Sequence, residues 1–267
     1  MEFDLETAVS RDGDGPWHGE VADGWDTPRG PLGGYVQAIV LSAMTAELDD
    51  PERSVRSMTM HFMRVPKAGP VTVEVTVERS GRSLSTLSAR LIQGEQTLGL
   101  ALAAFSKPWD GPLVDETAMP EVDPPEGRRI PVKPAQADKV PPFITRLTMQ
   151  PRFGEAPFTG SEHGIVGGWI GLAEERPIDA LSICVLADAW FPSPWPRLEA
   201  RAPAPTIDLT IHFRSPLPLP DGLLVGRFTN RHVRDGFFEE DGELWAPDGT
   251  LIAQSRQLGL LIGAPAS

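Results

Sequence analysis

The sequence predicts an α+β protein built from two similar halves, each consisting of a helix followed by an antiparallel sheet. Three observations lead to this fold class. A segment with helical spacing of apolar residues precedes about four segments in which apolar and polar residues alternate, and this order occurs twice. A proline-rich stretch separates the two occurrences. Short sequence segments also repeat between them.

The first half begins with an entry segment and continues with a helix. Residues 1–30 are rich in Gly, Asp and Trp and show little periodicity. Apolar residues from Val36 to Leu48 recur at helical spacing, and Pro51 ends the element. Alternating segments then predict strands at 58–63, 71–77, 84–91 and 97–105. We expect an antiparallel sheet wrapped around one helix.

The middle of the chain breaks this pattern. Residues 107–151 contain ten prolines, with charged and small residues between them. Proline has no backbone N–H and a fixed φ, so it leaves little room for regular structure. We therefore expect an N-terminal unit over 1–107, a partly extended linker over 108–151 and a C-terminal unit over 152–267.

The second half repeats the order of the first. A short strand is predicted at 164–169, and Pro177 opens a helix over 178–189. Four strands are expected after this helix, at 206–213, 223–230, 236–245 and 251–262.

Two pairs of segments match between the halves in sequence as well as in order. Met58–Phe62 (MTMHF) parallels Leu209–Phe213 (LTIHF), and residues 96–101 resemble residues 249–254. The common order favours an internal duplication. It also gives His61 and His212 equivalent strand positions, which predicts a shared packing role.

The composition is that of a globular protein with an acidic surface. The 267 residues are 40% hydrophobic and 23% charged, which allows a sizeable core. The formal net charge of −13 argues against a nucleic-acid partner, whose phosphates it would repel. The single cysteine, Cys184, excludes an intramolecular disulfide, and its apolar setting predicts a buried thiol.

Targeting and metal-binding signals are absent from the sequence. The N-terminus lacks the basic region and apolar stretch of a signal peptide, and no apolar run approaches the ~20 residues that span a bilayer. We therefore expect a cytoplasmic protein with no membrane partner. No spacing of Cys, His and Asp resembles a metal site, and Gly-x-Ser-x-Gly does not occur. We expect neither a metal nor a cofactor.

Three segments carry a resemblance to a known family. They are Leu32–Ala38 (LGGYVQA), Thr206–Phe213 (TIDLTIHF) and Leu251–Gly259 (LIAQSRQLG). In this order and spacing they resemble the TesB-like acyl-CoA thioesterases of the double-hotdog fold, over most of residues 25–106 and 160–262. The resemblance implies two hotdog units in one chain, an acyl-CoA substrate and hydrolysis of its thioester to a carboxylic acid and free CoA.

The resemblance also implies catalytic residues, because the family activates a water with an aspartate, a glutamine and a threonine. It places the aspartate at Asp208, the glutamine at Gln257 and the threonine at Thr229, with Asn230 as the alternative. These groups suffice chemically, because a thiolate leaves without help from a strong acid (a thiol pKa is ~8.5).

We also expect Gly33, Gly34 and Tyr35, at the start of the first predicted helix, to bind the substrate. At the start of a helix the backbone N–H groups are free and lie at the positive end of the helix dipole. They can receive a thioester oxyanion, or the glycines can simply allow close packing. We favour the ligand role.

Strand alternation assigns faces to these residues. On the Asp208 strand, one face carries Ile207, Leu209, Ile211 and Phe213, and the other carries Thr206, Asp208, Thr210 and His212. The second face is either solvated or catalytic. Gln257 shares a face with mostly apolar residues. Its amide therefore needs partners, either a water and Asp208 or a neighbouring backbone group.

Two other functions stay open at this point. In a hotdog enoyl-CoA hydratase or dehydratase, Asp208 and His212 would form an acid–base pair. A non-catalytic acyl-CoA binding protein would keep the fold without the activity. A homo-oligomer is compatible with either function and with the thioesterase.

Overall fold

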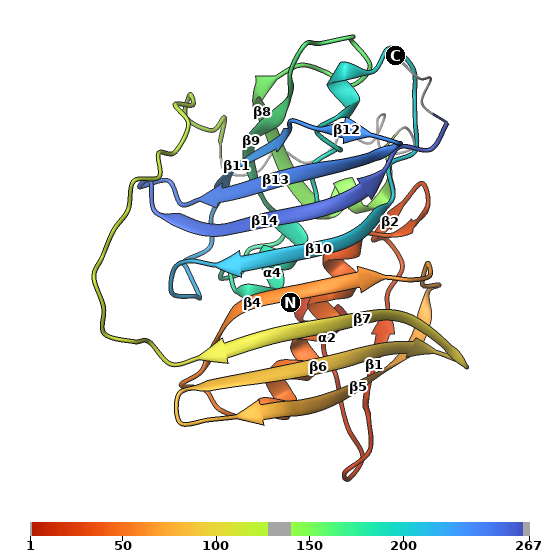
Figure 1. Ribbon diagram of the computed structural model, residues 1–267, viewed down its shortest axis with the longest axis vertical. Helices are drawn as coiled ribbons and strands as arrows, with labels where there is room; N and C mark the ends of the chain where they lie inside the picture. The colour runs from red at the N-terminus through yellow and green to blue at the C-terminus, as the bar shows by residue number, and fades with distance from the viewer. Residues whose placement is uncertain (1, 128–139, 264–267) are drawn as a thin grey trace.

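The computed structural model describes residues 2–127 and 140–263. Figure 1 shows one large, twisted sheet, with the two main helices behind it. The first half of the chain forms the lower part of this view, and the second half forms the upper part.

The first half contains the predicted helix and its four strands. Helix α2 (Gly33–Leu48) is followed by β4 (Ser54–Phe62), β5 (Gly69–Ser80), β6 (Leu84–Gln93) and β7 (Gln96–Ser106). Nearly all residues from Gly34 to Met44 in α2 are buried, because the helix packs against the sheet and against a helix of the second half. This explains why its apolar residues surround the helix instead of forming one stripe.

The entry segment has more structure than its sequence predicts. Helix α1 (Glu2–Glu6) forms an ion pair of 2.7 Å between Asp4 and Arg176 of the second half. Strand β1 (Trp17–Val21) pairs with β5, and the short strands β2 (Asp26–Thr27) and β3 (Gly30–Pro31) pair with each other. The partners of α1 and β1 lie far along the chain, so local periodicity does not reveal them.

The second half repeats this arrangement. Strand β9 (Gly164–Leu172) is followed by α4 (Ala180–Leu186), the 3₁₀ turn η2 (Trp195–Arg197) and then β10 (Thr206–Phe213), β11 (Leu224–Asn230), β12 (Val233–Arg234), β13 (Phe237–Trp245) and β14 (Leu251–Leu260). Helix α4 is shorter than predicted. It begins after a capping box, in which the carboxylate of Asp179 accepts the N–H of Ser182 at 2.8 Å.

Part of the predicted linker is folded. The 3₁₀ helix η1 (Pro142–Arg146) leads into the edge strand β8 (Leu147–Gly154), which pairs with β9. The second folded unit thus begins before residue 152, and Pro151 is accommodated because β8 lies at the edge of the sheet. Met119 and Val122 pack against a small cluster that includes Trp169 and Trp245. Residues 128–139 of the predicted linker lie outside the described residues.

All strands of the large sheet are antiparallel to their neighbours, in the order β1-β5-β6-β7-β4-β10-β14-β13-β11-β9-β8, with β12 paired to β13. The two halves join edge to edge through β4 and β10, where Thr59 lies opposite Thr210 and their hydroxyl oxygens are 2.9 Å apart. These two threonines are equivalent in the repeated sequences. The pseudo-twofold axis therefore passes between them, and the predicted duplication is visible in the fold.

One core fills the space between the sheet and the helices. It includes Cys184, which is fully buried as predicted, and burial raises the pKa of its thiol. In the described ranges, 2–127 and 140–263, no helix is both long and apolar enough to cross a membrane.

Candidate active site

A short row of polar side chains lies on the inner face of the sheet, the face that the helices cover. Gln257 on β14 lies opposite the core residue Leu209 on β10 and opposite Glu240 on β13. Only 7% of Gln257 is exposed. Its Nε2 donates to Oε1 of Glu240 at 2.6 Å, and its Oε1 accepts a hydrogen bond of 2.7 Å from Oγ1 of Thr206. The predicted position of Gln257 on the apolar face is confirmed.

Thr206 reaches Gln257 because β10 begins with a bulge. Thr206 pairs with Gly259 but Asp208 pairs with Leu258, so the strand carries one extra residue between these pairs. A bulge interrupts the alternation of side chains. Thr206 therefore lies on the inner face, whereas Asp208, next to the inward Leu209, lies on the outer face.

Glu240 is the buried carboxylate of this row. It is 3% exposed, and its Oε2 accepts a hydrogen bond of 2.5 Å from the backbone N–H of Ser193, in the segment between α4 and η2. Burial raises the pKa of Glu240, and the hydrogen bonds from Ser193 and Gln257 oppose that shift. Two elements that are far apart in sequence thus meet at this carboxylate.

Asp188 follows the end of α4 and faces the start of α2. Its Oδ2 accepts a hydrogen bond of 2.7 Å from the N–H of Gly34. Burial raises the pKa of Asp188 to about 7; the N–H groups of Gly34 and Gly33 oppose this rise, and the charge of Glu240 adds to it. A carboxylate with a pKa near neutrality is a far better proton acceptor than an ordinary one.

Steric contacts explain why positions 33 and 34 are glycines. A Cβ on Gly34 would overlap the carbonyl oxygen of Cys184 and lie 2.9 Å from Cβ of Asp188. A Cβ on Gly33 would lie 3.1 Å from Oδ2 of Asp188. The pair thus lets the end of α4 approach the start of α2. The N–H groups that we expected to bind a thioester oxyanion instead hold the carboxylate of Asp188.

Asp208, the aspartate that the resemblance suggested, lies elsewhere. On the outer face it is opposite His61 on β4 and Leu258 on β14, because the alternation that turns Leu209 inward turns Asp208 outward. The expected contact between Asp208 and Gln257 is therefore not formed. The bulge changes the face of Thr206 instead, because uninterrupted alternation would place Thr206 on the outer face together with Asp208.

The two candidates for the third position lie on opposite faces of β11. On β11, Phe228 belongs to the inner core, so Asn230 shares its face and Thr229 points outward. Nδ2 of Asn230 donates to the backbone oxygens of Glu239 and His232, at 2.8 and 3.0 Å. Of the two alternatives, Asn230 and not Thr229 lies on the side of Glu240.

Tyr35 is a core residue. It is 0% exposed, and its ring stacks on Trp25 with centroids 4.7 Å apart. Its hydroxyl donates to the backbone oxygen of Glu6 at 2.9 Å and accepts from the N–H of Ala22 at 3.0 Å. Burial raises the pKa of Tyr35 to about 12. The structure thus places Tyr35 within the core, and its expected contact with a substrate stays a prediction.

The outer face does not form the acid–base pair of a hydratase. Asp208 and His212 are four residues apart on one strand, or about 13 Å at the usual rise of ~3.3 Å per residue. His212 lies opposite Ser57, and burial and the nearby charge of Arg214 lower its pKa.

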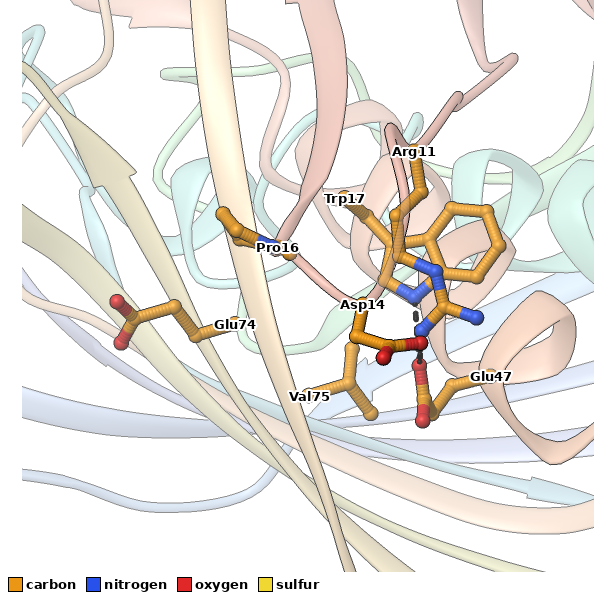
Figure 2. Close-up of a pocket in the computed structure, with 8 residues that line it drawn as sticks. Arg11, Asp14, Pro16, Trp17, Glu47, Glu74 and Val75 are labelled. Atoms are coloured by element: carbon orange, nitrogen blue, oxygen red, sulfur yellow. Dashed lines mark hydrogen bonds and ion pairs between the residues drawn. The ribbon is translucent and has the colours of Figure 1, made fainter.

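A surface hollow of about 250 Å³ lies at the other end of α2 (Figure 2). Its lining includes Arg11, Trp17 and Glu47. The guanidinium of Arg11 lies 2.5 Å from Glu47 and 4.4 Å from the ring centroid of Trp17, so its charge is already engaged. Glu47 is fourteen residues from Gly33 in the same helix, about 21 Å away at ~1.5 Å per residue. The hollow is therefore separate from Asp188.

Sequence patterns contain some signal for the residues that we did not predict. Asp188 stands alone between Ala187 and Ala189 in an apolar segment, and a carboxylate in such a setting needs a specific partner. Glu240 has the same parity as the apolar Phe238 and Leu244, which places it inward. Thr206 has no comparable signal, since a bulge is a feature of strand pairing.

Known proteins resemble this chain in sequence and in fold. The family of acyl-CoA thioesterase N-terminal domains matches residues 21–106, and the family of acyl-CoA thioesterase C-terminal domains matches residues 118–261. Acyl-CoA thioesterase 2 of Haemophilus influenzae is 27% identical over 255 residues, which cover 86% of this chain and 87% of that protein.

Solved structures extend this likeness. A conserved protein of unknown function with a hot dog fold from Alicyclobacillus acidocaldarius is 26% identical, with a TM-score of 0.86 and coverage of 100% of this chain and 99% of that one. An acyl-CoA thioesterase II from Mycobacterium marinum shares the fold, with a TM-score of 0.78 at 19% identity over 100% of this chain and 99% of that one. With both halves matched in order, the chain belongs to the acyl-CoA thioesterase family and is a thioesterase of the double-hotdog fold.

Proposed function

We propose that the protein hydrolyses acyl-CoA thioesters to carboxylic acids and free CoA, with Asp188, Gln257 and Thr206 acting on the attacking water. The observation that carries this assignment is the setting of Asp188. It is a partly buried carboxylate with a pKa of about 7, held by Gly34 and close enough to Glu240 to respond to its charge. Glu240 in turn binds Gln257.

The proposed reaction needs one proton acceptor and one good leaving group. Asp188 takes a proton from water as the water oxygen bonds to the thioester carbonyl carbon. The carbon–sulfur bond then breaks, and CoA leaves as a thiolate that is protonated afterwards. Because a thiol pKa is about 8.5, the leaving group requires no strong acid. The products are one carboxylate, one CoA thiol and one proton.

Gln257 supplies hydrogen bonds for this step. An amide has two N–H hydrogens and an oxygen with two lone pairs. One N–H is bound to Glu240 and one lone pair to Thr206, so a second N–H and a second lone pair are left to orient the water or the thioester oxygen. Groups held in place before the reaction stabilise the transition state without reorganising.

The experiment is release of free thiol from a panel of acyl-CoAs of different chain length, with the wild type and Asp188→Asn. We expect hydrolysis by the wild type and a loss on the order of 10²–10⁴ in kcat for the variant, because a general base is removed. Thermal melts show whether the variant is folded. Acyl-CoA binding without thiol release would support a binding protein, and full activity of Asp188→Asn would exclude this carboxylate as the base.

A further inference from the structure

We infer that Glu240 is a positioning residue, which fixes the direction of the Gln257 amide and places a negative charge beside Asp188. This inference rests on the proposed function, in which both of these neighbours act on the water. Glu240 lies opposite Gln257 on the neighbouring strand β13, and we assign it no contact with the substrate.

The first argument concerns the direction of the amide. The two ends of an amide have nearly the same shape, but one accepts hydrogen bonds and the other donates them. An ionised carboxylate only accepts, so Glu240 requires Nε2 of Gln257 to face it, at 2.6 Å. Oε1 of Gln257 then faces Thr206, at 2.7 Å. Without Glu240, the amide could turn over and exchange its donor for its acceptor.

The second argument concerns the cost of burial. A buried carboxylate is unfavourable unless it is paired or hydrogen-bonded. Elsewhere on β13, Asp241 is bound by Arg256 at 2.6 Å and Glu243 by Arg227 at 2.5 Å. In the described part of the chain, no ion pair within 4.0 Å is formed by Glu240, which relies on Ser193 and Gln257. An apolar residue would fill this inner position without that cost, so the carboxylate points to a role in the site.

The third argument concerns charge. Glu240 and Asp188 come from different elements, and the charge of Glu240 favours the protonated form of Asp188. The other ionisable groups around this pair are Asp241, whose charge is offset by Arg256 and Arg231 on the outer face, and Cys184, whose raised pKa keeps it neutral. Removing the charge of Glu240 should therefore lower the pKa of Asp188, since less repulsion opposes its ionisation.

The test compares Glu240→Gln with Glu243→Gln in steady-state hydrolysis across pH, on an acyl-CoA that the wild type hydrolyses. Both variants lose one negative charge on β13, but Glu243 lies on the outer face, paired with Arg227. For Glu240→Gln we expect kcat to fall about tenfold to 100-fold, because a reacting group is misplaced, with KM changed by less than about threefold. The acid limb of the rate profile should move to lower pH. Glu243→Gln should change neither.

Glu240→Asp separates the two effects and serves if Glu240→Gln does not fold. It keeps the charge but is one methylene too short for the bond to Gln257, so kcat should fall while the acid limb stays in place. The position of that limb is independent of how much of the enzyme is folded. If the wild type is active and the folded Glu240 variants keep both its kcat and its acid limb, the inference about Glu240 is wrong while the proposed function stands. A wild type that releases no thiol overturns the proposed function first.

Discussion

The backbone N–H of Gly34 donates a hydrogen bond to the carboxylate of Asp188 at 2.7 Å, across 154 positions of sequence. The start of the helix of one half thus holds the acidic group of the other half. The bond explains how Asp188 keeps a negative charge available in a largely buried place, because helix N-termini favour anions. It also makes the proposed active site a property of both halves together.

The stability of the protein should depend on pH through Asp188. Its pKa rises from an ordinary value of 3.8 to about 7 in the folded protein. Between these values the folded state retains a proton that the unfolded chain has released, so stability falls as pH rises through this window. Asp188→Asn removes this contribution. The free energy of unfolding of the variant relative to the wild type, measured with urea, should therefore increase between pH 4 and pH 7. A constant difference across that range would show that Asp188 has no raised pKa.

Gly34→Ala should damage both fold and activity. The added methyl group would overlap the carbonyl oxygen of Cys184, so α2 and α4 must separate. Overpacking of this kind costs about 1–3 kcal/mol, and the shift would also displace Asp188. Gly222→Ala is the matched control, because a Cβ there meets nothing within 4 Å. Thermal melts and thiol release check both variants, and equal behaviour of the two would contradict the close helix contact.

Thr206→Val and Asp208→Asn should differ in their effects on hydrolysis. The valine keeps the shape of Thr206 but removes its bond to Gln257, which should lower kcat about fivefold, as expected for one hydrogen bond of ~1 kcal/mol. Asp208 lies on the outer face, so its substitution should change kcat by less than about threefold. Parallel thiol-release assays decide the matter. The opposite ranking would restore Asp208 as the catalytic aspartate.

Gln37→Met should stabilise the protein. Gln37 is 0% exposed, and neither of its amide atoms has a hydrogen-bond partner within residues 2–127 and 140–263. A buried polar group without a partner costs about 1–3 kcal/mol, and methionine fills a similar volume without that cost. Urea unfolding of both proteins measures the difference. Lower stability of the variant would indicate that a bound water or ligand satisfies the amide of Gln37.

Much of the fold could be predicted because it depends on local periodicity. The alternating segments around Met58–Phe62 and Leu209–Phe213 became β4 and β10, which join the halves. The parity of Gln257 with its apolar neighbours placed its side chain inward, and the structure confirms that face. The entry segment and β8 were not predicted, because edge strands such as Trp17–Val21 are selected by their partner strand more than by their own pattern.

The amino-acid sequence by itself determined the two halves, their order of helix and strands, the glycine pair at the start of the first helix and the face that Gln257 occupies. These features follow from the 3.6- and 2-residue periods of helices and strands and from the absence of a side chain on glycine. Only the tertiary structure brought Asp188 to the proposed site. The bulge between Thr206 and Asp208 arises from pairing with β14, and Asp188 meets Gly34 because α4 packs against α2. Both contacts join segments that are far apart in the chain, so local periodicity does not predict them.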